Sequence, residues 1–130
     1  MNRNLKLALA ALLLAALFPY GWLAEVWPSF GRILYGVFDS PLTHAIGHAV
    51  GFFVLGLILL VARVLPPRIA QYALGVLAIA LVQELFQQSY HQGGSLLDLG
   101  ADLGADLVAS GLALAAFRAQ AGSGPAGASR

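Results

Sequence analysis

Residues 42–64, LTHAIGHAVGFFVLGLILLVARV, form an apolar stretch long enough to cross a lipid bilayer as one helix. A hydrocarbon core of about 30 Å requires roughly 20 apolar residues, since each residue of a helix rises 1.5 Å. Three further blocks have this length and character, at about residues 5–23, 69–89 and 96–117. The sequence therefore predicts an all-α membrane protein in which four transmembrane helices form a single domain over residues 1–118.

The composition agrees with lipid as the main surroundings of the chain. Of 130 residues, 59% are hydrophobic and 10% are charged, whereas about 25% of an ordinary soluble domain is charged. A net charge of +1 without long basic runs excludes nucleic acid as an expected partner. Because the chain has no Cys, disulfides and thiolate metal sites are excluded, and His, Asp, Glu and Ser remain for chemistry.

The distribution of basic residues predicts an orientation, because Lys and Arg near helix ends favour the cytoplasmic side. With both termini inside (N-in/C-in), only Arg32 lies outside, and the cytoplasmic side holds Arg3, Lys6, Arg63, Arg68, Arg118 and Arg130. Residues 24–40 are predicted to be a short interfacial segment between the first two helices, and 119–130 a disordered cytoplasmic tail. An alternative stays open, in which the first block is a cleaved signal peptide with a basic start.

Ionisable residues gather in, or beside, the outer half of the last three predicted helices: His44, His48, Glu84, His91, Asp98, Asp102 and Asp106. A carboxylate near a helix centre costs about 2.5 to 3.5 kcal/mol on insertion scales, so these residues are candidates for function. The three Asp residues recur every four positions, which places them within about 80° of one another along roughly 12 Å of helix. The sequence thus predicts one acidic stripe along this helix.

The spacing of His44 and His48 places both imidazoles on one helix face, where they could bind a divalent metal together with Asp106. A pair of histidines that only form hydrogen bonds is the plainer interpretation. Asp98 stands three residues after Ser95, the spacing of a capping box, so it also has a structural interpretation. On the opposite face of this predicted helix, a row of small residues is expected to pack against a neighbour: Gly100, Gly104 and Gly111, with Ala101, Ala105 and Ala109.

The order of these residues, over about residues 40–115, resembles the VanZ-like family of small membrane proteins, which is named for resistance to the glycopeptide teicoplanin. The matching motifs are His48 followed by AVGFFVLG, Glu84-Leu-Phe-Gln87, Gly93-Gly94-Ser95, Asp98 and Asp102. Two positions depart from the family pattern, because Gly94 stands where the family usually has Arg and Asp102 where it usually has Asn. The missing Arg removes a partner for a carboxylate or phosphate.

The resemblance implies a multi-pass protein of the bacterial plasma membrane with an outward-facing site. Its candidate catalytic residues are His48, Glu84, Asp98 and Asp102, and its candidate substrate-binding residues are Gln87, His91 and Ser95. The expected partner is a membrane lipid, a lipid-linked wall precursor or a glycopeptide antibiotic.

Whether the site catalyses a reaction stays open at the level of sequence. Three alternatives to such a binding protein remain: an intramembrane metal-dependent hydrolase, a proton- or cation-coupled carrier that would require an oligomer, and a scaffold without catalysis.

Overall fold

The computed structural model describes residues 7, 10, 11, 13–15, 18, 20–90 and 96–122, and over these ranges the chain contains helices and no strand. The helices are connected in sequence by short segments, and α4, α5 and α6 are the long ones. Their bounds are α2 Tyr20–Val26, α3 Pro28–Val37, α4 Pro41–Val61, α5 Ile69–Tyr90 and α6 Leu96–Gly122.

The three long helices are each apolar and long enough to cross a membrane, with spans at Pro41–Val61, Ile69–Gln88 and Leu96–Gly122. They correspond to the second, third and fourth predicted blocks, so the chain is a multi-pass, all-helical membrane protein. Of the first predicted helix, 5–23, the structure describes residues 7, 10, 11, 13–15, 18 and 20–23. Within it, Phe18 is not helical and α2 begins at Tyr20. A fourth span therefore stays a prediction.

Local signals define both ends of α4. The Ser40 side chain accepts a hydrogen bond from the Thr43 backbone N–H at 3.1 Å, and Pro41 occupies the first turn. At the other end, Arg63 adopts a left-handed conformation with φ 57°, and the Val64 N–H donates to the Leu59 carbonyl at 2.9 Å. This Schellman motif satisfies the free carbonyls of the last turn. The helix therefore ends at Val61, before the predicted boundary at Val64.

The C-terminal boundary of the last helix also differs from the prediction. We predicted a disordered tail from residue 119, but α6 continues through Gly122. The reason is local, because Ala119, Gln120 and Ala121 are all good helix formers although they are not part of the apolar block. The rest of the predicted tail, 123–130, lies outside the described residues.

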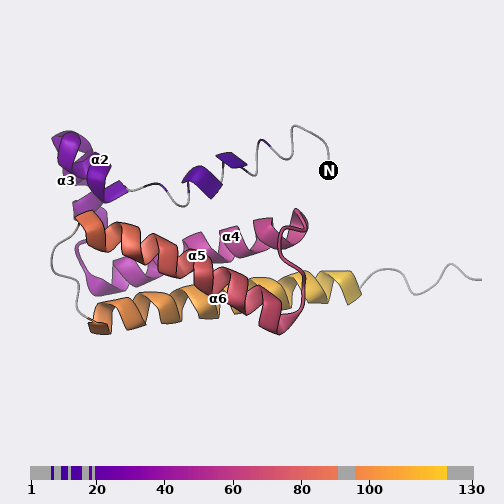
Figure 1. Cartoon of the computed structure of the whole chain (residues 1–130). Helices are drawn as coiled ribbons and strands as arrows, with labels where there is room; N and C mark the ends of the chain where they lie inside the picture. Colours follow the sequence, from indigo (N-terminus) through magenta and orange to yellow (C-terminus); the bar gives the residue numbers. More distant parts are fainter. Residues whose placement is uncertain are drawn as a thin grey trace, which may run out of the picture.

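Two short helices, α2 and α3, occupy most of the segment predicted to be interfacial. They pack closely, since a Cβ added at Gly31 of α3 would lie 2.7 Å from the Ala24 backbone oxygen of α2. Several apolar side chains of α3 are exposed, including Ile33 and Val37. In Figure 1 this helical pair lies at the end of the bundle where α4 begins and α5 ends.

In the bundle, α4 and α6 run side by side in the same direction, and α5 runs in the opposite direction across them (Figure 1). The apolar interior between them includes Phe52, Leu55 and Leu59 of α4, Tyr72 and Val76 of α5, and Ala109 and Leu114 of α6. The helices meet closely at Gly56, where an added Cβ would lie 3.2 Å from the Ala113 Cβ and still nearer the Tyr72 hydroxyl. Gly56 is therefore the packing glycine of the three-helix contact.

The prediction for the glycines of α6 is wrong. Gly100, Gly104 and Gly111 are exposed, and a Cβ added at any of them would meet nothing within 4 Å. They lie on the side of α6 opposite Asp102 and Asp106, and both of these acidic residues are buried. Because burying the carboxylates inside the bundle turns that face inward, the glycine face must turn outward.

Candidate functional site

The imidazole of His48 lies buried between carboxylates from the two neighbouring helices. Its Nδ1 is 3.1 Å from Oδ1 of Asp106 on α6, at hydrogen-bond distance. Its Nε2 is 3.9 Å from Oε1 of Glu84 on α5, close enough for an ion pair but too long for a hydrogen bond. All three side chains are more than nine-tenths buried. His48 thus joins α4, α5 and α6 inside the membrane span.

A second pair lies one helical turn nearer the end of the bundle. Nε2 of His44 is 3.4 Å from Oδ2 of Asp102, and the two histidine rings have centroids 4.8 Å apart. The His44 side chain is 43% exposed and that of Asp102 is 11% exposed. The cluster formed by His44, His48, Glu84, Asp102 and Asp106, which we call the His48 cluster, is therefore open at His44 and closed at His48.

A constant register between α4 and α6 produces these pairs. His44 faces Asp102, His48 faces Asp106, and one turn further the Ser110 hydroxyl donates to the Phe52 carbonyl at 3.3 Å. Each pair is separated by 58 positions in sequence. Because both helices repeat every 3.6 residues and run in the same direction, residues spaced by four stay opposite one another.

Ser110 and Tyr72 are polar residues of the interior that the sequence analysis missed. The Tyr72 hydroxyl donates to the Ser110 carbonyl at 3.2 Å, and both residues are buried. A signal for Ser110 was present, since it continues the four-residue spacing of Asp98, Asp102 and Asp106. One turn further along α4 from His48, the ring of Phe52 lies parallel to the imidazole, with centroids 6.5 Å apart. Phe52 is therefore the apolar residue that borders the cluster on the side away from His44.

Two buried carboxylate oxygens in the cluster, Oε1 of Glu84 and Oδ2 of Asp106, have no hydrogen-bond partner. A buried polar group without a partner costs about 1–3 kcal/mol, and a charged group costs more. The sequences of α4 and α5 contain no Lys or Arg, and Arg118 of α6 donates to the Pro67 carbonyl at the other end of the bundle. Among the residues that the structure describes in the three spans, the three carboxylates are therefore balanced only by two imidazoles, an arrangement suited to binding a cation.

The structure brings together five of the residues that the sequence singled out, and these are the members of the His48 cluster. Asp98 is exposed in the first turn of α6, so only the second and third residues of the acidic stripe are buried. Gln87 is half-buried on α5, one turn from Glu84. The remaining two candidates, His91 and Ser95, lie outside the described residues.

The three potential metal ligands differ in one member from those proposed from the sequence. The ligand atoms of His44, His48 and Asp102 lie within 4.8 Å of one another. Asp106, which the sequence analysis paired with the two histidines, instead approaches Nδ1 of His48. The geometry therefore favours Asp102 as the third ligand and gives Asp106 the position of an orienting partner.

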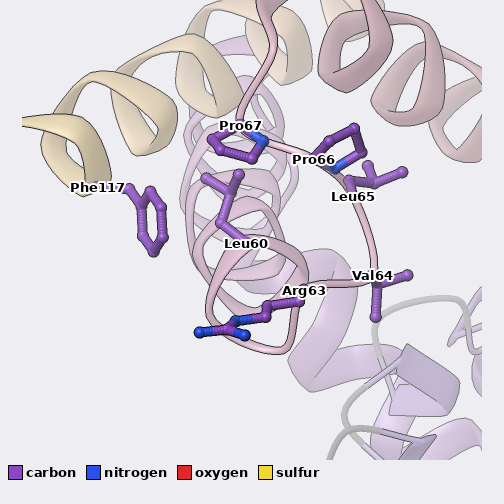
Figure 2. Close-up of a pocket in the computed structure, with 7 residues that line it drawn as sticks. All are labelled: Leu60, Arg63, Val64, Leu65, Pro66, Pro67 and Phe117. Atoms are coloured by element: carbon purple, nitrogen blue, oxygen red, sulfur yellow. The ribbon is translucent and has the colours of Figure 1, made fainter. Parts of the chain in front are cut away.

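A separate hollow of about 370 Å³ lies at the other end of the bundle, where the α4–α5 connection meets α6. Figure 2 shows its mostly apolar lining, which consists of Leu60, Arg63, Val64, Leu65, Pro66, Pro67 and Phe117. It shares no residue with the His48 cluster. The chemistry of the spans is thus concentrated at the His44 end.

Comparison of the chain with protein-family models, with curated proteins and with solved structures finds no match in any of the three. These comparisons leave the family of the chain open.

Proposed function

We propose that the chain is a VanZ-like protein of the bacterial plasma membrane that binds the polar head of an envelope molecule in the His48 cluster. The envelope molecule is a lipid, a lipid-linked wall precursor or a glycopeptide antibiotic. One observation carries the proposal: ionisable side chains from three spans converge on the buried His48 side chain. The cluster that they form is exposed to the surroundings at His44. Ionisable residues buried inside a membrane span are candidates for binding sites and ion pathways by default.

The family resemblance and the geometry agree on part of the site. His48 and Glu84 belong both to the motifs of the resemblance and to the cluster. Asp102, which stands where the family usually has Asn, is also a member, whereas the motif residue Asp98 is exposed. The count of Lys and Arg residues near the helix ends favours an orientation with the His44 end outside. In that orientation the open side of the cluster faces the head groups of the outer leaflet.

The charge of the cluster indicates what kind of head group fits. Three carboxylates and two imidazoles favour a group that carries positive charge, such as an ammonium or a phosphate with a bound divalent cation. A bare phosphate fits less well, because Gly94 stands where an Arg would be expected from the resemblance. An amine-bearing ligand is therefore the better match.

The test uses Glu84→Gln, which removes the charge while retaining the shape of the side chain. Gln71→Ala is the matched control, because Gln71 is exposed on the same helix far from the cluster. Each version is expressed at equal membrane levels in a teicoplanin-sensitive bacterium. Growth inhibition by teicoplanin and the lipids that co-purify with the chain are then measured.

We expect the wild-type chain and Gln71→Ala to retain an envelope lipid or to lower teicoplanin sensitivity. Glu84→Gln should lose the same effect. The proposal is wrong if Glu84→Gln behaves as the wild type does, or if the wild-type chain neither retains a lipid nor changes sensitivity.

A second candidate function, a metal-dependent hydrolase, is favoured by the grouping of His44, His48 and Asp102. A bound divalent ion would lower the pKa of its water, and Glu84, whose Oε1 lies 3.9 Å from Nε2 of His48, would be the nearby base. This candidate requires a metal ion, so a folded chain that binds no divalent metal would exclude it.

A further inference from the structure

We propose that His44, His48 and Asp102 bind one divalent transition-metal ion of the zinc type, with Asp106 orienting His48 and Glu84 lying beside the ion. This inference stands apart from the proposed function, because a metal ion can be bound whether or not any envelope molecule is. It rests on the ligand types, their spacing, two unpartnered oxygens and the charge of the cluster.

The ligand set is chemically suitable. Imidazole nitrogens and a carboxylate oxygen are ordinary zinc ligands, and three protein ligands with one open position characterise sites where the ion meets a substrate or water. In a four-coordinate site with bonds of about 2.0–2.1 Å, neighbouring ligand atoms lie about 3.3–3.4 Å apart. Nε2 of His44 and Oδ2 of Asp102 are 3.4 Å apart. His44, His48 and Asp102 each offer a ligand atom within 4.8 Å of the others, a wider spacing, so the side chains would have to close on the ion as it binds.

Asp106 provides the second part of the argument. When the Nδ1–H of His48 donates to Oδ1 of Asp106, the lone pair of His48 is fixed on Nε2. Metal-bound histidines almost always donate their other N–H to a carboxylate or carbonyl in this way. The short contact between His48 and Asp106 therefore prepares His48 to be a ligand.

The unpartnered oxygen of Glu84 supplies an independent observation. In this tautomer, Nε2 of His48 and Oε1 of Glu84 are two acceptors that face each other across 3.9 Å. Both side chains are more than nine-tenths buried, and Oε1 of Glu84 has no hydrogen bond. Two facing acceptors repel unless a positive charge lies beside them, and a divalent cation at the ligand group supplies it.

The side of the cluster at which the ion would enter is also defined. His44 is the exposed ligand and His48 the buried one, so an ion approaching from the His44 end reaches the ligands without crossing the apolar interior. The same opening leaves a coordination position available for water or a head-group oxygen.

The experiment uses the full-length chain, purified in mild detergent with an affinity tag that contains no histidine. The protein is loaded with Zn²⁺ or Co²⁺ and desalted, and bound metal is measured by mass spectrometry. Co²⁺ is also followed by its visible spectrum, which distinguishes a four-coordinate site from the hydrated ion. The variants are His44→Gln and Asp102→Asn, which change ligands, Asp106→Asn, which changes the orienting partner, and Gln71→Ala as the control.

We expect about one ion per chain in the wild type and in Gln71→Ala, with a four-coordinate Co²⁺ spectrum. His44→Gln and Asp102→Asn should lose the ion, and Asp106→Asn should bind it about 10- to 100-fold more weakly. Circular dichroism confirms that each variant is folded.

Two results would overturn the inference. One is a folded wild-type chain that retains no Zn²⁺ or Co²⁺ under any loading condition, which would leave a proton as the positive charge between His48 and the carboxylates. The other is unchanged binding by both ligand variants, which would place the ion elsewhere. Neither result bears on lipid retention or teicoplanin sensitivity, so the two proposals fail separately.

Discussion

Gly56 offers the sharpest test of how the three spans are held together. Substituting Ala at this position adds one methyl group where α4, α5 and α6 meet, 3.2 Å from the Ala113 Cβ and within clashing distance of the Tyr72 hydroxyl. Overpacking of this kind costs about 1–3 kcal/mol. Displacing the Tyr72 hydroxyl also weakens its hydrogen bond to the Ser110 carbonyl, which is worth about 0.5–1.5 kcal/mol.

The matched control is Gly51→Ala, on the same helix, where an added Cβ meets nothing within 4 Å. Both substitutions share the gain in helix propensity of Ala over Gly, so this gain cancels when the two variants are compared. Gly56→Ala should therefore be less stable than Gly51→Ala by about 1.5–4.5 kcal/mol, which is at least tenfold in the unfolding equilibrium.

The assay is reversible unfolding by sodium dodecyl sulfate in mixed micelles, followed by circular dichroism. Tyr72→Phe removes the hydroxyl that the new methyl group meets, so Gly56→Ala should cost less in that background than in the wild type. Equal stability of Gly56→Ala and Gly51→Ala would refute the close contact of the three helices at Gly56.

Three further predictions concern the buried charges and the short helices. Glu84→Leu should raise the free energy of unfolding by about 1–3 kcal/mol in the same micelle assay, because it removes a buried carboxylate oxygen without a hydrogen bond. Asp106→Ala should lower the free energy of unfolding by about 3–5 kcal/mol, because His48 loses its hydrogen-bond partner. If Glu84→Leu also lowered the stability, Glu84 would be a stabilising residue as Asp106 is, contrary to this prediction. Gly31→Ala should separate α3 from α2 and change tryptophan fluorescence, whereas Gly36→Ala, with open space around it, should not. Identical spectra for these last two variants would argue against the close α2–α3 packing.

Much of the bundle could be predicted from sequence because its signals are local. The length of an apolar block reports a span, and Ser40 followed by Pro41 marks the start of α4. The four-residue spacing of Asp102 and Asp106 showed that they share one face. The cost of a carboxylate in lipid then implied that this face turns inward, where the structure has it.

What could not be predicted depends on contacts between helices. The register that places His44 opposite Asp102 is set by close packing along α4 and α6, which no single-helix pattern encodes. The same packing decides that Asp98 is exposed and that Gly56, rather than Gly104, is the glycine of the contact. The end of α4 was also missed, because Arg63 adopts the left-handed conformation usually taken by Gly.

The parallel stack of Phe52 on His48 has a consequence for transport. Beyond that ring, the buried residues of α4 are Leu55, Gly56, Leu59 and Leu60, and a charged group passing them would leave its ionisable partners for a mostly apolar interior. Among the residues that the structure describes, the interior beyond Phe52 is mostly apolar, so we expect a charged group that reaches His48 in a single chain to leave again at the His44 end. Planar bilayers containing monomeric protein should accordingly carry no steady current when a voltage is applied.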